Sequence, residues 1–142
     1  MLDPLNRFVV YRNDRRSKYG GGVAILINCC LHSIQIDIDS KFSEIECLVC
    51  DLLCASPVRF MVFYRPPNYD SDVLNSICKC IELYSSIEFS TVIVGDFNCG
   101  SIDWHDFNRG SSDFYSLFFN TVNNLGFSQY IDQPTRGNNI LA

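Results

Sequence analysis

The sequence predicts an α/β protein, with strands in its first part and helices alternating with a strand in its second part. Apolar stretches of strand length follow one another from residue 8 to residue 64, and two stretches with helical spacing then flank one more apolar run. Of the 142 residues, 47% are hydrophobic and 13% aromatic, which can supply a sizeable core. This order predicts sheets that bury one face on each other, with helices covering the outer faces.

Five strands are expected in the first part. The third alternates isoleucines with polar residues, which is typical of a strand with one face in water. The fourth is almost continuously apolar and is predicted to be central, and the fifth stops at two prolines that cannot donate to a ladder. A polar loop closed by glycines, residues 13–22, separates the first two. The five expected strands are residues 8–11, 23–27, 34–38, 45–53 and 59–64.

Two helices and one strand, residues 91–94, are expected after the prolines. The first helix has Ser71 or Asp70 as its N-cap. The second starts at Ser112 and stops at Gly126. The chain shows no repeat, low-complexity segment or linker, so a single domain over residues 1–142 is predicted. The apolar faces expected on the two helices are Leu74, Ile77, Cys78, Ile81 and Tyr84, and Phe114, Leu117, Phe118, Val122 and Leu125.

The most informative segment is Gly95-Asp96-Phe97-Asn98, which directly follows the run 91–94. Strand residues two apart share a face, so an extended Asp96 and Asn98 would point the same way. A carboxylate can orient a water or take its proton, and an amide can donate to a phosphate oxygen. Asp and Asn also cap turns well, so a simple turn is the alternative interpretation.

Several further motifs accompany this segment in a fixed order. They are Tyr11-Arg12-Asn13-Asp14-Arg15, the glycine-rich run 20–27, Phe63-Tyr64-Arg65-Pro66-Pro67, Ile102-Asp103-Trp104 and Asp132-Gln133-Pro134-Thr135-Arg136. With them the sequence resembles the endonuclease/exonuclease/phosphatase family, and most closely the endonuclease domain of non-LTR (LINE-type) retrotransposon polyproteins. The resemblance implies a four-layer α/β sandwich of two packed mixed sheets flanked by helices. In that fold the strand ends meet at one rim, which would bring Tyr64, Asp96 and Asn98 together.

The resemblance implies metal-assisted hydrolysis of a phosphodiester, with Mg²⁺ as the usual ion. In this chemistry a retrotransposon endonuclease nicks target DNA and leaves a 3′ hydroxyl that primes reverse transcription. Asp96 would orient the attacking water, and Asn98 would donate to the scissile phosphate. Tyr64 would contact that phosphate through its phenol, although a core aromatic is the alternative interpretation.

Three further residues are implied to bind substrate. Arg65 could pair with a neighbouring phosphate, because a guanidinium suits bidentate recognition, or form a salt bridge at the sheet edge. Thr135 and Arg136 sit where related endonucleases contact DNA through a surface loop, or they belong to a turn only.

A complete family domain would also carry an early Asn, a metal-binding Glu and a final Ser-Asp-His segment, and this chain shows none of them. The chain is therefore expected to be a partial domain that retains no assigned metal ligand and is inactive or very weak alone. The expected partners are DNA and a reverse transcriptase domain in the same polyprotein, and the expected location is intracellular, in the nucleus for the full-length protein. Alternatives are a non-catalytic remnant, a weak nucleic-acid-binding module, or a phosphatase or phosphodiesterase of the same superfamily.

Four other titratable residues are not assigned to the chemistry. Glu44 and Glu46 precede an apolar strand and are expected to be surface or edge residues, because the family Glu would lie upstream of Tyr11. His32 is expected in a turn, and His105 in the loop after the Asp-x-Asn motif.

The charge pattern gives a mixed signal. A net charge of −5 argues against a polyphosphate ligand held by long-range attraction alone. No stretch reaches the roughly 18 apolar residues of a membrane span, and the N-terminus lacks the apolar core of a secretory signal. A basic segment could lie along a nucleic-acid backbone or be a solvated loop. It holds five of the 11 basic residues, which are Arg7, Arg12, Arg15, Arg16 and Lys18.

Eight cysteines are present, mostly in or beside apolar runs. Cys47 and Cys50 have half of a zinc-site spacing, but in a strand this spacing sends the two thiols to opposite faces. Without a second pair or a secretion signal, reduced cysteines that serve as small buried hydrophobes are predicted.

Overall fold

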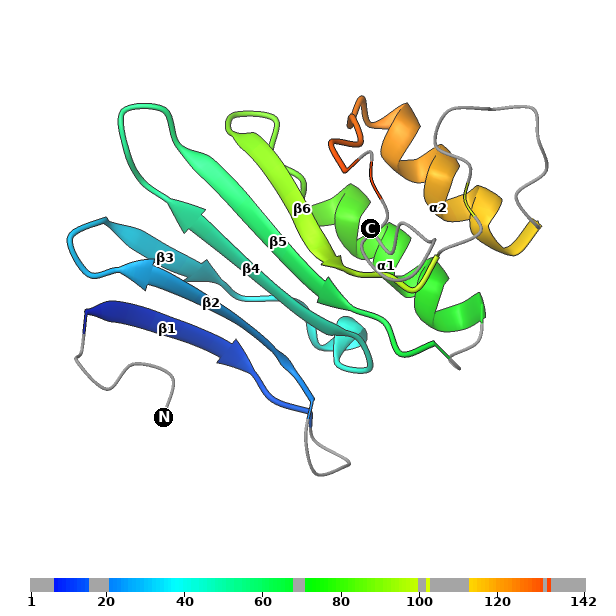
Figure 1. Cartoon of the computed structure of the whole chain (residues 1–142), viewed down its shortest axis with the longest axis horizontal. Helices are drawn as coiled ribbons and strands as arrows, with labels where there is room; N and C mark the ends of the chain where they lie inside the picture. The colour runs from blue at the N-terminus through cyan, green and yellow to red at the C-terminus, as the bar shows by residue number, and fades with distance from the viewer. Residues whose placement is uncertain are drawn as a thin grey trace. The chain divides into compact units, whose positions relative to one another are not determined.

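The computed structural model describes residues 7–15, 21–67, 71–99, 102, 113–131 and 133. They form a two-stranded sheet, a four-stranded sheet and two α-helices, which confirms the α/β class (Figure 1). The chain divides into two compact units, one of Met1–Tyr64 with Tyr84–Gly95 and one of Arg65–Leu83 with Asp96–Ala142.

The first unit contains both sheets. β1 and β2 form the antiparallel two-stranded sheet, and the larger sheet has the order β3-β4-β5-β6. Its first three strands are antiparallel neighbours, whereas β6 runs in the same direction as β5 in Figure 1. The smaller sheet lies against β4 and β5. The strands are β1 (Phe8–Asn13), β2 (Val23–Asn28), β3 (Ser33–Ile36), β4 (Glu46–Leu52), β5 (Val58–Tyr64) and β6 (Ser90–Asp96).

The predicted central strand is confirmed in β4, which lies between β3 and β5. Its residues from Cys47 to Asp51 are all buried, so both of its faces are covered. Cys47 and Cys50 are 2% and 0% exposed, as expected for thiols on opposite faces of a strand with no wet side. The predicted third strand is shorter than expected, because β3 ends at Ile36 and a 3-10 turn, Ser40–Phe42, precedes β4.

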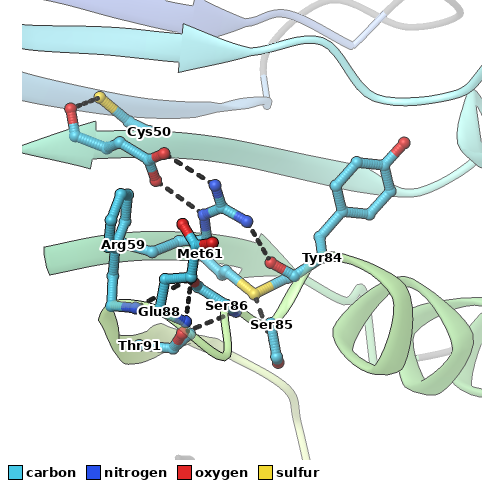
Figure 2. A network of polar contacts seen from close by, with 10 residues as sticks. Cys50, Arg59, Met61, Tyr84, Ser85, Ser86, Glu88 and Thr91 are labelled. Atoms are coloured by element: carbon cyan, nitrogen blue, oxygen red, sulfur yellow. Dashed lines mark hydrogen bonds and ion pairs between the residues drawn. The ribbon is translucent and has the colours of Figure 1, made fainter.

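A partly buried ion pair joins β4 to β5 inside the first unit. Arg59 donates to both carboxylate oxygens of its cross-strand neighbour Asp51, at 2.7 Å each. The Arg59 Nη1 also donates to the carbonyl oxygen of Tyr84 at 2.9 Å (Figure 2). Tyr84 is the last residue of α1 (Ser71–Tyr84), so Arg59 satisfies one of the carbonyls that a helix end leaves unpaired. The hydrogen bond to Asp51 raises the pKa of Arg59.

Hydroxyl groups order the short connection between α1 and β6. The backbone N–H of Ser86 donates to the Thr91 hydroxyl at 3.1 Å, and the Ser86 hydroxyl accepts from the N–H groups of Glu88 and Phe89 (Figure 2). The Ser85 hydroxyl lies 4.0 Å from the Met61 sulfur. The connection therefore makes its backbone hydrogen bonds with side chains.

The second unit contains nearly all of α1 and all of α2 (Asp113–Asn124). The predicted inner face of α1 is confirmed at Leu74, Ile77, Cys78 and Ile81, which are all buried. Helix α1 starts at Ser71, with an acidic residue in its first turn where the helix dipole favours negative charge.

The inner face of α2 differs from the prediction. Phe118 and Thr121 are buried, but Leu117 and Leu125 are 44% and 42% exposed, so the prediction is wrong for these two leucines. The buried stripe runs through positions three apart, which leaves Leu117 beside it. Leu125 lies after the last helical residue, in the turn that Gly126 closes with a φ of 77°.

The cysteine prediction is confirmed for five of the eight residues. Cys47, Cys50, Cys78, Cys80 and Cys99 are buried and reduced. It is wrong for Cys29, Cys30 and Cys54, which are reduced but exposed in connections between strands. Burial raises the pKa of the Cys50 and Cys78 thiols to about 11, so they stay protonated near neutral pH. In the described part of the chain, neither helix is long and apolar enough to cross a bilayer.

Candidate functional site

Gly95 allows the ends of β5 and β6 to approach each other. A Cβ at position 95 would stand 2.1 Å from the carbonyl oxygen of Phe63 and 2.9 Å from its carbonyl carbon, which no side chain tolerates. Directly after β5, the Arg65 N–H donates to the carbonyl oxygen of Asp96, the residue that follows Gly95, at 2.9 Å. Two motifs that are distant in sequence therefore meet at hydrogen-bonding distance.

A tight turn follows β6 directly. The backbone N–H of Asn98 donates to the Asp96 Oδ1 at 3.1 Å, and Asn98 has a φ of 51°. Asn is one of the few residues other than glycine that adopt this left-handed conformation readily. The expected extended arrangement of Asp96 and Asn98 is therefore wrong, because the strand ends at Asp96 and Asn98 lies in an Asx turn.

The Asn98 side chain fastens this turn to the end of β5. Its Nδ2 donates to the Arg65 carbonyl oxygen at 2.7 Å. A primary amide carries two N–H donors, so a second one remains for another acceptor. The half-buried Asp96 uses Oδ1 in the turn, and Oδ2 accepts no hydrogen bond from any described residue. The turn thus offers one carboxylate oxygen and one amide N–H to a ligand.

The Arg65 side chain contacts the backbone of the turn. It is 1% exposed, and its Nη1 lies 3.2 Å from the Phe97 carbonyl oxygen and 3.5 Å from that of Asn98. The guanidinium also lies 5.9 Å from the centroid of the Tyr115 ring. In these contacts the guanidinium lies against backbone carbonyl oxygens. The expected phosphate contact of Arg65 stays a prediction, and the guanidinium would have to leave this position to make it.

Phe97 and Cys99 anchor the turn in the core of the second unit. The Phe97 ring is buried and lies 4.7 Å from the ring of Phe118 on α2, measured between centroids. Burial raises the pKa of Cys99 to about 12, with the nearby charge of Arg65 acting in the opposite direction. A thiol held in this protonated form is a poor nucleophile, so Cys99 has a packing role.

Tyr64, the last residue of β5, belongs to the first unit and is half-buried there. Its cross-strand neighbour is Glu46, the first residue of β4. The Arg15 guanidinium lies 5.7 Å from the centroid of the Tyr64 ring and donates to Glu46 Oε1 from Nε at 2.7 Å. A second contact joins Arg15 Nη2 to the same oxygen at 2.6 Å. Sequence reasoning missed this cluster, because its members are far apart in the chain.

The cluster bears on two expectations. Glu46 was expected to be a surface or edge residue, and its side chain is 12% exposed at the first residue of β4, so it is half-buried at a strand end. In the basic segment, Arg15 is 22% exposed and paired with Glu46, so this arginine differs from a fully solvated loop residue. The hydrogen bond to Glu46 raises the pKa of Arg15, which strengthens its charged form. Glu44 is exposed, as expected. His32 is exposed but lies directly before β3, after the turn of Cys29 and Cys30, and its carbonyl oxygen accepts from the Leu53 N–H at 2.8 Å.

Several candidate residues lie outside the described residues. They are Thr135, Arg136, His105, Arg16 and Lys18. Within the described ranges, no group of three or more histidine, cysteine or acidic residues could hold a metal ion. Asp96 contributes one carboxylate at the turn, which by itself does not make a Mg²⁺ site. The described residues therefore do not fit the ion that the resemblance implies.

Comparison with known proteins identifies a structural neighbour. No protein-family model matches the chain, and no curated protein matches it. The fold is similar to that of the "Endonuclease domain of TRAS1, a telomere-specific non-LTR retrotransposon", with a TM-score of 0.65 and 16% sequence identity over 92% of this chain. The chain spans 59% of the length of that structure. At this identity the likeness establishes a shared fold.

Proposed function

We propose that this chain is part of a phosphodiesterase domain that nicks DNA, as a member of the endonuclease/exonuclease/phosphatase family. The observation that carries the proposal is the turn at the end of β6, which holds Asp96 and Asn98 in hydrogen-bonded order against Arg65. The fold shared with a retrotransposon endonuclease domain supports the same activity. The substrate would be a retrotransposon target site, with a reverse transcriptase domain as partner and the nucleus as location.

The roles follow from the donors and acceptors that the turn leaves available. Asp96 Oδ2 orients the attacking water and takes its proton. The second amide N–H of Asn98 donates to a phosphate oxygen. A phosphate contact of the Tyr64 hydroxyl is proposed from the resemblance alone. The water oxygen bonds to phosphorus, the bond from phosphorus to the 3′ oxygen breaks, and that oxygen takes up a proton. Arg65 acts indirectly, because its guanidinium holds the backbone of the turn.

Mg²⁺ remains part of the proposal through the resemblance alone. When bound, such an ion would neutralise charge on the phosphate. No step is assigned to it, since the described residues do not assemble its ligands. Because the chain covers 59% of its structural neighbour, we expect weak or absent nicking by the chain alone.

A plasmid nicking assay in Mg²⁺, with EDTA as the metal-free arm, tests the proposal. The chain and a longer polypeptide that spans the neighbour's full length are compared on supercoiled DNA. We expect the longer polypeptide to nick, and Asp96→Ala to slow it at least about 100-fold. The control Asp37→Ala removes an exposed carboxylate from the loop after β3 and leaves the rate unchanged.

Three outcomes would contradict the proposal. Equal nicking by the longer polypeptide with and without Asp96→Ala would remove the assigned role of Asp96. Robust Asp96-dependent nicking by the chain alone would contradict the expected weakness. Cleavage of inositol phosphates or sphingolipids in a substrate panel, without DNA nicking, would move the chain to another branch of the superfamily.

A second candidate function is a nucleic-acid-binding module without catalysis. It is favoured by the position of Arg65, whose guanidinium contacts carbonyl oxygens of the turn and so is not placed on a reacting phosphate. Salt-dependent DNA binding by the longer polypeptide, with no turnover at any Mg²⁺ concentration, would support this candidate.

A further inference from the structure

The cluster around Tyr64 is built as a closed set of hydrogen bonds. Glu46 Oε1 accepts from Nε and Nη2 of Arg15, at 2.7 Å and 2.6 Å. Glu46 Oε2 accepts from the backbone N–H of Gly22 at 2.6 Å. One carboxylate oxygen therefore accepts from the guanidinium and the other from a backbone N–H, and the two contacts with Arg15 fix the orientation of the guanidinium.

A glycine leaves room for this guanidinium. Gly21 has a φ of 101°, and a Cβ on it would stand 2.6 Å from Arg15 Cζ. Gly22 has a φ of 104°, and a Cβ on it would stand 2.6 Å from the Asn13 carbonyl oxygen, so it lies against the backbone that leads to Arg15. The Arg15 guanidinium therefore lies against Gly21, and it lies 5.7 Å from the centroid of the Tyr64 ring. Fixing an arginine this way costs side-chain entropy, which a solvated surface arginine would not lose.

The strand register directs this cluster at Tyr64. Glu46 and Tyr64 are directly opposed on neighbouring strands, so their side chains leave the same face of the sheet. Tyr64 ends β5, and directly after it the Arg65 N–H donates to the Asp96 carbonyl oxygen, so the backbone beside the Tyr64 ring is fixed. The ring itself is contacted by the Arg15 guanidinium, which lies 5.7 Å from the ring centroid and whose charge is balanced by Glu46.

We propose that Arg15 and Glu46 are positioning residues that hold the Tyr64 ring for its contact with the phosphate. This inference rests on the proposed function for the ligand, but the restraint on the ring is a property of the chain itself. In this proposal Arg15 acts through Tyr64, because it donates to Glu46 from Nε and Nη2 and its guanidinium lies against the Tyr64 ring. Lysine cannot replace it, since an ammonium lacks the planar fork that binds Glu46 and stacks on the ring.

Nuclear magnetic resonance of the whole chain tests the restraint without any activity. Tyr64→Phe identifies the Tyr64 ring signals by their loss. In the wild-type protein we expect a nuclear Overhauser effect between the Arg15 side chain and the Tyr64 ring. Glu46→Gln and Arg15→Lys are expected to shift the ring signals and remove this effect. The matched controls Glu44→Gln and Arg12→Lys change exposed side chains nearby and leave the ring signals in place.

The inference is overturned if the wild-type protein lacks the Overhauser effect, a result that needs no variant to fold. It is also overturned if the ring signals are unchanged in a folded Glu46→Gln protein. A 12-base-pair DNA duplex then tests the function by fluorescence anisotropy. Tyr64→Phe and Glu46→Gln are each expected to weaken binding about tenfold, and the double variant no more than either alone.

Additive losses in the double variant would show that Glu46 does not act through Tyr64, and the inference would fail. If the wild-type chain and the longer polypeptide neither bind nor nick DNA, the proposed function fails instead. The resonance experiment still decides the positioning of Tyr64 in that case.

Discussion

Gly95 is the residue on which the candidate turn depends most directly. Its missing side chain lets β6 approach β5 closely. A Cβ on this residue would stand 2.1 Å from the Phe63 carbonyl oxygen. Asp96 then reaches the backbone of Arg65. The glycine of the Gly-Asp-Phe-Asn segment is therefore required by the close approach of β5 and β6. Of the residues that follow it, Asp96 ends the strand, Phe97 packs its ring in the core, and Asn98 adopts the left-handed conformation of the turn.

Substituting Gly95 should be far more damaging than substituting a glycine that faces open space. We expect Gly95→Ala to lower the free energy of unfolding by about 3 kcal/mol, because β5 and β6 must separate. Gly126→Ala is the control, since nothing lies within 4 Å of its Cβ and only the left-handed φ of 77° is penalised, by roughly 1 kcal/mol. Urea unfolding followed by circular dichroism measures both. Equal losses would show that the close approach is not retained in solution.

The same residues show what the sequence could and could not predict about the site. Spacing alone located Asp96 and Asn98 after a strand. It did not reveal the left-handed φ of Asn98, because a pattern of residue types carries no backbone angle. The partnership of Arg15 with Glu46 was also invisible, since it joins positions 31 apart through tertiary contact.

At the scale of elements, the spacing of apolar residues predicted the strands well, because the burial of a strand face or of both faces determines where apolar residues stand. The continuous apolar run became the central β4, and the proline pair marked the end of β5. The face of α2 was predicted less well. Several apolar residues lie at neighbouring angles on this helix, and packing alone decides that Phe118 is inside and Leu117 outside.

The ion pair between β4 and β5 gives the first unit a testable electrostatic tie. Asp51→Asn should lower the free energy of unfolding by about 3–5 kcal/mol, because Arg59, whose side chain is largely buried, would lose the carboxylate that balances its charge. Asp14→Asn breaks an ion pair of similar geometry whose partners are both 58% exposed, and should change stability by about 0.5 kcal/mol or less. Thermal unfolding compares the two variants. A small effect of Asp51→Asn would mean that water reaches Arg59.

At the scale of the whole molecule, the buried thiols predict a loss of stability in alkaline solution. Burial raises the pKa of Cys50 and Cys78 to about 11 and that of Cys99 to about 12, from 9.0. Between these values the folded chain binds more protons than the unfolded chain, so stability falls as pH rises. The full contribution of these thiols is present below pH 9.0 and is lost towards pH 11.

Each of the three thiols should contribute about 1.4 kcal/mol per pH unit within that window. Urea midpoints measured from pH 8 to pH 10.5 give the slope. Cys78→Ala should make the slope shallower, whereas Cys54→Ala removes an exposed thiol and should leave it as it is. An unchanged slope in Cys78→Ala would show that this thiol ionises without unfolding.

The contact between the tilted rings of Phe97 and Phe118 has a dynamic consequence. The ring between Asp96 and Asn98 is held by α2, so the turn is fastened to a helix of the second unit as well as to a strand end. A transient opening of α2 would release the Phe97 ring. The hydrogen bond that the Asn98 backbone N–H donates to Asp96 would then weaken. Hydrogen exchange at that amide should therefore follow the protection of α2 amides more closely than that of β6 amides. The position of the Asp96 carboxylate would then depend on how stably α2 packs.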